Sequence, residues 1–160
     1  MAESNGQGGE IRTQSVTPHL ALRNAAEAID FYKKAFGATE NSRMVNPQDG
    51  RILHAEIQIG NSRIYLADEC PQFGFVSPLD TAGKTTVALH LHVEDGDATM
   101  QRAEEAGATV LMPMALMFWG DRFGKIADPF GHSWSISQKF ETLTPEQMQE
   151  RMAAAMAKSA

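Results

Sequence analysis

The sequence predicts an α+β fold in which two βαβββ modules form a cupped mixed β-sheet with outer helices, followed by a C-terminal helix. One observation behind this prediction is an internal repeat, because Gly37-Ala38-Thr39 recurs as Gly107-Ala108-Thr109 at an offset of 107 − 37 = 70 residues. Another is the reversal Asp128-Pro129-Phe130-Gly131 between two short apolar-alternating runs, which is typical of a tight β-hairpin. Since one βαβββ module exposes a sheet face and cannot enclose a cavity alone, the two copies are expected to pair.

The length and composition favour one folded domain. The chain has 160 residues, 42% of them hydrophobic and 21% charged, which suits a globular protein with a buried core. Its net charge of −6 argues against a nucleic-acid partner and against an anionic membrane surface. Cys70 is the single cysteine, so an internal disulfide and a Cys-rich zinc site are excluded. With no signal-peptide pattern at the N-terminus, we expect a cytoplasmic protein.

The chain divides into segments by composition and pattern. The first fifteen residues are polar and rich in glycine, and we expect them to be flexible. A single domain follows, made of two modules joined by a linker that contains Phe73 and Phe75, and the chain ends in a helix. The predicted bounds are 1–15 for the N-terminus, 16–138 for the domain, 16–69 and 85–138 for the modules, 70–84 for the linker and 139–160 for the C-terminal helix.

The first module begins with an apolar strand over 16–22 and continues with a helix. Asn24 is the predicted N-cap of that helix, Glu27 completes its capping box, and Gly37 ends it as a left-handed residue. Alternating apolar and polar residues then predict strands over 39–45, 51–59 and 63–68.

The second module repeats this order. We expect a strand over 86–93, a helix capped by Asp95 or Asp97 and ended by Gly107, and three further strands. Those strands are predicted over 108–117, 121–127 and 132–137. His90 repeats His19 at an offset of 90 − 19 = 71, which places the two histidines on equivalent strands.

The C-terminal segment has the signature of a capped helix. Thr144 is the predicted N-cap, Pro145 the first helical residue and Gln147 the third. Met148, Met152 and Met156 then form an apolar stripe at helical spacing. This stripe can pack on the chain's own sheet or cover a neighbouring subunit, and methionine suits either surface.

A polar, histidine-rich set alternates with the apolar strand residues. By alternation its members face away from the helix of their module: Thr17, His19, His54, Glu56, Gln58, His90 and His92. Imidazole and carboxylate groups are ligands for zinc, nickel, manganese or iron(II), so a divalent-metal site is one interpretation. The other is that they are hydrogen-bonded wall residues, with Glu56 paired to Arg122 or Arg51.

Several motifs together carry a family resemblance. They are Ile29-Asp30-Phe31-Tyr32 with Phe36-Gly37, His54-Ala55-Glu56, and the stretch from Trp119-Gly120-Asp121-Arg122-Phe123-Gly124 to Asp128-Pro129-Phe130-Gly131-His132. Over residues 16–138 they resemble the glyoxalase/bleomycin resistance family, the vicinal oxygen chelate superfamily, and in particular its PhnB-like branch. The resemblance implies a small-molecule cavity between the modules and a homodimer.

The resemblance does not extend to the metal ligands. Metal-dependent members similar to glyoxalase I take ligands from the first and last strand of each module. In this sequence those positions correspond to Thr17, Tyr65, Ala88 and Ser135, of which Tyr65 and Ser135 are poor ligands for a divalent metal. A metal held by His19, His90 and Glu56 would therefore be a new arrangement.

Three functions follow as hypotheses. The first is small-molecule binding without chemistry, with pocket residues Thr17, His19, His54, Glu56, His90, His92, Trp119 and Arg122. In this hypothesis aromatic residues such as Trp119 and Phe123 supply stacking walls, and Arg122 or Lys125 contacts an anion. The second is a metal-dependent lyase, isomerase or dioxygenase that uses His19, His90 and Glu56, with Glu56 or His54 as the candidate catalytic base. The third is a non-catalytic regulatory domain.

Overall fold

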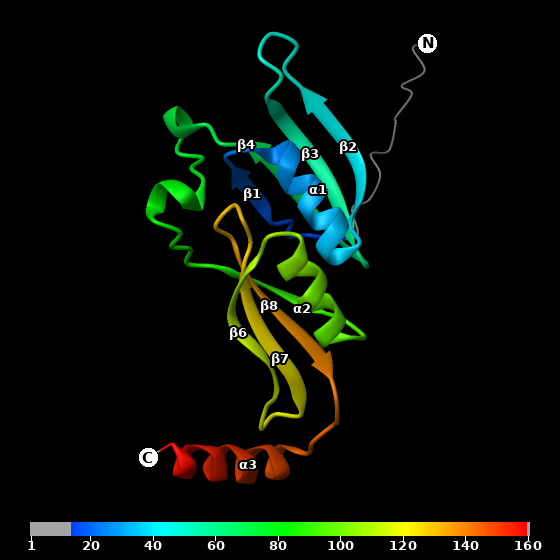
Figure 1. Cartoon of the computed structure of the whole chain (residues 1–160), viewed down its shortest axis with the longest axis vertical. Helices are drawn as coiled ribbons and strands as arrows, with labels where there is room; N and C mark the ends of the chain where they lie inside the picture. Colours follow the sequence, from blue (N-terminus) through cyan, green and yellow to red (C-terminus); the bar gives the residue numbers. More distant parts are fainter. Residues whose placement is uncertain (1–13, 160) are drawn as a thin grey trace, which may run out of the picture.

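The computed structural model describes residues 14–159 and confirms the predicted fold class (Figure 1). The first module consists of β1 (His19–Leu22), α1 (Ala25–Phe36), β2 (Thr39–Val45), β3 (Ile52–Ile59) and β4 (Ser62–Asp68). The linker forms two short 3₁₀ turns, Pro71–Phe73 and Pro78–Thr81. The second module consists of β5 (Ala88–His92), α2 (Gly96–Glu105), β6 (Thr109–Leu116), β7 (Asp121–Ala127) and β8 (Ser133–Lys139), and α3 (Pro145–Lys158) follows.

Each module contains one four-stranded mixed sheet. The strand orders are β1-β4-β3-β2 and β5-β8-β7-β6, so the first strand of each module lies parallel to its last. His19 pairs with Tyr65 in the first sheet, and His90 pairs with Ser135 in the second. The internal repeat seen in the sequence is therefore preserved in the register of the strands.

The helix ends follow the local signals. The Asn24 side chain accepts a hydrogen bond from the Glu27 backbone N–H at 3.2 Å, and Gly37 ends α1 with φ of 68°. Asp95, one of the two predicted residues, caps α2. Thr144 and Gln147 form the predicted capping box of α3. These boundaries were predictable because each cap is made by residues close in sequence.

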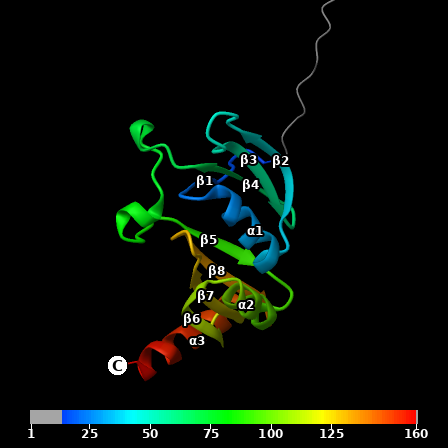
Figure 2. The ribbon, with the colours of Figure 1, turned by 45° about the horizontal axis from the view of Figure 1, so that its top comes forward.

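The two modules meet through their helices, which refines the predicted arrangement of one cup with outer helices. The sheets remain separate, and α1 and α2 contact each other at the junction of the modules (Figures 1 and 2). Tyr32 and Phe36 of α1 also pack on Trp134 of β8, with ring centroids 5.4 and 4.7 Å apart. α1 packs on both modules because its apolar surface is too wide for one sheet to cover.

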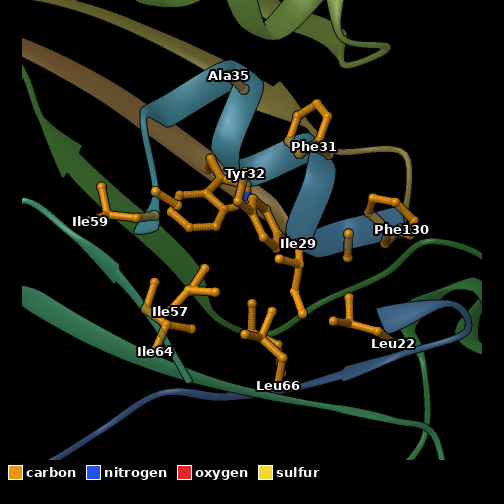
Figure 3. Packing of buried hydrophobic residues seen from close by; sticks show 14 of the residues in the cluster. Leu22, Ile29, Phe31, Tyr32, Ala35, Ile57, Ile59, Ile64, Leu66 and Phe130 are labelled. Atoms are coloured by element: carbon orange, nitrogen blue, oxygen red, sulfur yellow. The ribbon is translucent and has the colours of Figure 1, made fainter. Parts of the chain in front are cut away.

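One hydrophobic core runs through both modules. Figure 3 shows Ile29 and Tyr32 pointing from α1 toward the sheet residues Ile57 and Leu66, and all four are fully buried. Phe31 extends to the second module, where its ring lies 6.2 Å from that of Phe130. Burial of each such side chain contributes about 1.5–3 kcal/mol to folding.

The Asp128 carboxylate ties the modules together. It is 4% exposed and accepts hydrogen bonds from the Tyr32 hydroxyl at 2.6 Å and from the Trp134 indole N–H at 2.9 Å. Its other oxygen accepts from the backbone N–H groups of Phe130 at 3.0 Å and His132 at 2.9 Å. The Asp-Pro-Phe-Gly reversal is therefore both a hairpin turn and the acceptor for a residue of the other module.

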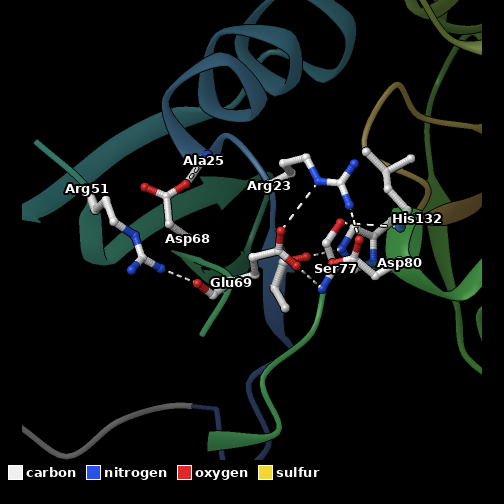
Figure 4. A network of polar contacts seen from close by, with 10 residues as sticks. Arg23, Ala25, Arg51, Asp68, Glu69, Ser77, Asp80 and His132 are labelled. Carbon is white, nitrogen blue, oxygen red and sulfur yellow. Dashed lines mark hydrogen bonds and ion pairs between the residues drawn. The ribbon is translucent and has the colours of Figure 1, made fainter. Parts of the chain in front are cut away.

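The linker is held by a polar network (Figure 4). Arg23 forms ion pairs with Glu69 and Asp80, and the second oxygen of Glu69 accepts a hydrogen bond from the Ser77 backbone N–H at 3.0 Å. On the same side, His132 contacts the backbone oxygen of Ala21 through Nε2 at 3.0 Å. The network fixes the path between the modules.

The predicted flexible N-terminus lies mostly outside the described residues. Gln14, the first described residue, is not free: its side-chain amide exchanges two hydrogen bonds with the Arg63 backbone, at 2.9 and 3.0 Å. A side-chain amide has one donor and one acceptor in the geometry of a peptide group, so it can pair with an exposed strand edge. Contacts with the first module thus already include Gln14, before the predicted start of the domain at residue 16.

Removal of the Asp128 carboxylate tests its role in joining the modules. We expect Asp128→Ala to lower the free energy of unfolding by about 3 kcal/mol, because it leaves three buried donors and one partly buried donor without their acceptor. Tyr32→Phe removes one donor and should cost about 1 kcal/mol. Denaturant unfolding measures both, with the exposed Asp30→Ala as control; a loss for Asp128→Ala no larger than the control would contradict this role.

Candidate functional site

A cleft of about 700 Å³ lies at the junction of the modules. Both modules supply its apolar wall, which contains Phe36, Ile59, Ile64, Leu89, Leu91 and Trp134. Leu89 and Leu91 lie on β5 and Ile59 and Ile64 flank the β3–β4 turn, so the cleft exists only where the modules are held together. A cavity of this size fits a small organic molecule.

Polar groups of both signs also line the cleft. His90 and His92 come from β5, Glu94 and Asp95 directly precede α2, and Arg63 and Arg102 come from opposite modules. The Arg102 guanidinium donates to the Thr99 hydroxyl at 3.0 Å. A pocket with apolar walls and a few polar groups is typical of a ligand site in which the polar groups set the orientation.

His90 is held in a defined orientation. Its Nδ1 lies 2.7 Å from the Ser135 hydroxyl of the neighbouring strand, and its ring stacks on Phe123 at 6.0 Å. The His92 ring lies 4.6 Å away. Partial burial and the His92 imidazole lower the pKa of His90 below its ordinary value of 6.5, although Asp121 acts in the opposite direction. The lowered pKa favours the neutral form of the His90 imidazole.

A separate aromatic cluster surrounds His19. The His19 ring lies 5.8 Å from His54, 6.0 Å from Tyr65 and 4.8 Å from Phe75. Partial burial and the His54 imidazole lower the pKa of His19. Phe75 of the linker thus packs directly on this cluster. By strand alternation the cluster lies on the sheet face opposite α1.

Glu56 is engaged within its own module. Its carboxylate accepts a hydrogen bond from the Asn41 side chain at 2.9 Å and lies 3.8 Å from the Arg63 guanidinium. Its partner is thus Arg63 rather than Arg122 or Arg51. Across residues 14–159, no three His, Cys, Asp or Glu side chains gather closely enough to hold a metal ion. Within one chain, His19, Glu56 and His90 therefore do not form the predicted metal site.

The remaining predicted pocket residues lie elsewhere. Arg122 donates two hydrogen bonds to the Asp97 carboxylate of α2, at 2.7 and 2.9 Å, which raise the pKa of the guanidinium. Trp119 packs against Phe123 near α3, and Thr17 is half-buried just before β1. Of the predicted set, the cleft is lined by His90 and His92.

Sequence reasoning missed most of the cleft. Phe36, Ile59 and Leu89 have the pattern of ordinary core residues, and Arg63 and Arg102 that of exposed residues. Phe36 and Ile59 share one sequence signal: each comes directly before a glycine, Gly37 or Gly60, that ends a helix or a strand. Such a glycine predicts where a helix or strand ends, but it does not predict which of these ends lie together in the folded chain.

Comparison with known proteins identifies the family. The family model of the glyoxalase/bleomycin resistance protein/dioxygenase superfamily matches residues 15–136. The chain belongs to this superfamily. An uncharacterized protein of Mycobacterium tuberculosis is 44% identical over 142 residues, which cover 88% of this chain and 83% of that protein. An uncharacterized protein of Arabidopsis thaliana is 28% identical over 134 residues, 79% of each chain.

Solved structures of other proteins have the same fold. An Arabidopsis thaliana gene product superimposes with a TM-score of 0.62 at 26% identity, covering 79% of this chain and 99% of that one. TioX from Micromonospora sp. ML1 has a TM-score of 0.59 at 25% identity and covers 82% and 100% of the chains. A Bacillus cereus protein described as PhnB has a TM-score of 0.60 at 19% identity, covering 78% and 99%, which shows the fold alone.

The residues at the glyoxalase-type ligand positions do not fit a divalent metal. Ser135 is 5% exposed and its hydroxyl contacts His90, while the Tyr65 ring packs at 4.7 Å from His54. Such sites rely on imidazole, carboxylate or thiolate ligands, and neither of these residues supplies one.

Among the described helices, none is long and apolar enough to cross a membrane.

The lowered histidine pKa values predict a pH dependence of stability. The unfolded chain protonates His19 and His90 near 6.5, whereas the folded chain does so at lower pH. The histidine contribution is therefore fully present above pH 6.5 and is lost as the pH falls through 6.5 toward the folded values. We expect the thermal unfolding midpoint to fall over this range, and to fall less in the His19→Gln/His90→Gln double variant. Equal slopes for the two proteins would contradict it.

Proposed function

We propose that this member of the superfamily binds a small organic molecule in the cleft between its modules and performs no metal chemistry there. The observation that carries the proposal is the cleft of about 700 Å³ with apolar walls from both modules. Its volume is within the range of pockets that bury most of a small ligand. This is the bleomycin-resistance type of function, in which the ligand is held rather than converted.

The cleft favours a ligand with an apolar body and a polar end. Phe36 offers a ring surface that is backed by the buried Trp134 ring at a centroid distance of 4.7 Å, and Leu89 and Leu91 extend the apolar wall. Arg63 and Arg102 supply hydrogen-bond donors on the polar side. Because Asp95 and Glu94 lie beside these donors, the polar end of the ligand has both donor and acceptor groups rather than a strong negative charge.

Three further expectations belong to this proposal. The chain is a member of the PhnB-like branch, it acts in the cytoplasm, and it forms a homodimer. The dimer is supported by large exposed side chains on the sheets, such as Met44 at 60% and Leu111 at 58% exposure. Multi-angle light scattering tests it: a mass of two chains at micromolar concentration supports the dimer, and a mass of one chain overturns it.

A cleft-filling substitution tests the binding site. Leu91→Trp adds volume inside the cleft, whereas Leu53→Trp adds the same side chain at an exposed position outside its lining. Native mass spectrometry of untagged protein should detect a bound small molecule in the wild type and in Leu53→Trp. Leu91→Trp should weaken its retention at least about tenfold, because overpacking excludes the ligand. Equal retention in all three proteins would show that the ligand lies elsewhere.

Metal analysis tests the metal-dependent alternative. The proposal predicts far less than one zinc, nickel, manganese or iron per chain in untagged protein, and no change in Glu56→Gln or His90→Ala. Near-stoichiometric metal that is lost in both variants would replace the proposal with a metal-dependent lyase, isomerase or dioxygenase.

A further inference from the structure

A second hollow, of about 620 Å³, lies between α3 and the second sheet and shares no lining residue with the cleft. We call it the α3 groove. Its walls are aromatic and sulfur-containing: Phe118, Trp119, Phe123, Met112, Met117 and Met156. Phe118 and Phe123 pack edge-on against the Trp119 ring, at 5.0 and 5.4 Å.

The turn before β7 builds both sides of this groove. Phe118 and Trp119 lie in the turn closed by the hydrogen bond from Gly120 N–H to the Met117 oxygen at 3.1 Å. The Gly120 oxygen accepts from the backbone N–H groups of Phe140 and Glu141, at 3.1 and 2.9 Å. A Cβ at Gly120 would lie 2.8 Å from the Glu141 oxygen, so glycine is needed for this close approach. The turn that presents the aromatic rings thus also anchors the segment leading into α3.

The helix itself has little packing of its own. None of its residues Pro145–Lys158 is buried, and Met156, which lines the groove, is 63% exposed. A bidentate ion pair from Arg151 to Glu141 fixes its first half. The apolar face of α3 thus lies beside the groove without filling it. This leaves room for a ligand between the helix and the sheet.

The charge in the groove indicates what that component is. Lys125 lines the groove, is exposed, and has its Nζ 6.0 Å from the Phe123 ring centroid. Its neighbours Arg122 and Lys139 form ion pairs with Asp97 and Asp121, but no carboxylate of residues 14–159 pairs with Lys125. In a chain of net charge −6, an ammonium without a carboxylate partner, in a groove that three aromatic rings also line, favours an anionic aromatic ligand.

We propose that the α3 groove is a second binding site, for an aromatic molecule that carries a single negative charge. Its rings pack on Trp119 and Phe123, its anionic group lies at Lys125, and Met156 of α3 covers the opposite side. The adaptable thioether side chains of the groove accommodate ring systems of different outline. This site is independent of the cleft and does not rest on the function proposed for it.

Two fluorescent probes that differ by one charged group test this site. 1-Anilinonaphthalene-8-sulfonate is an aromatic anion, and N-phenyl-1-naphthylamine is the same ring system without the sulfonate. We expect the wild type to bind the anion more tightly, and Lys125→Met to weaken the anion about threefold while leaving the neutral probe unchanged. Trp119→Ala should weaken both probes about tenfold, because both lose the ring contact. The preference for the anion should shrink with added salt.

Matched substitutions separate the groove from other surfaces. Met156→Asp should weaken the anionic probe, whereas Met148→Asp, on the same helix but outside the lining, should not. Lys84→Met, which removes a lysine of the linker outside the groove lining, should leave both probes unchanged. Each variant must retain the circular dichroism spectrum and unfolding midpoint of the wild type, since unfolded protein also binds these dyes.

Two outcomes would overturn the proposal. One is equal binding of both probes by wild type, Lys125→Met and Trp119→Ala. The other is a drop in mass from two chains to one in Trp119→Ala or Met156→Asp by light scattering, with probe binding unaffected by Lys125→Met. That result would make the groove an interface between copies of the chain.

Discussion

The buried carboxylate of Asp128 is the constraint on which the arrangement of this molecule depends. It is placed by a turn of the second module, yet one of its four donors is the Tyr32 hydroxyl of the first module. Burial and the adjacent carboxylate raise the pKa of Tyr32 well above 10.0, so the hydroxyl remains a donor throughout the neutral range. A buried charge is tolerated when its oxygens are fully hydrogen-bonded, and each donor here is oriented by the same group.

This constraint connects the fold to the candidate site. Trp134 donates its indole N–H to Asp128 while its ring lines the cleft beside Phe36. The group that joins the modules therefore also orients a wall of the cleft. Because the modules join through α1 and α2, the opposite sheet faces, with His19 and His54 on one and Phe123 on the other, lie away from the junction. One chain thus offers a cleft at the junction and a groove under α3, and the two sites differ in charge.

Much of the fold could be predicted because its signals are local. Asn24, Gly37 and Thr144 act within four residues, and the Asp-Pro-Phe-Gly turn closes on itself. The repeat then predicts two equivalent sheets. What the sequence could not supply is the contact between Tyr32 and Asp128, 96 residues apart, which sets the helices between the modules. Alternation likewise placed His19 and His90 on equivalent faces but carried no distance between them, and the structure puts them in different clusters.

The central claim is that the contacts around Asp128 make the two modules one cooperative unit and so maintain the cleft. Native-state hydrogen exchange tests this most directly, by comparing the slowest amides of β3 and β4 with those of β7 and β8. The account predicts one opening free energy and one denaturant dependence for both sets, equal to the values for global unfolding. Two distinct sets of values, with one sheet opening while the other remains protected, would contradict it.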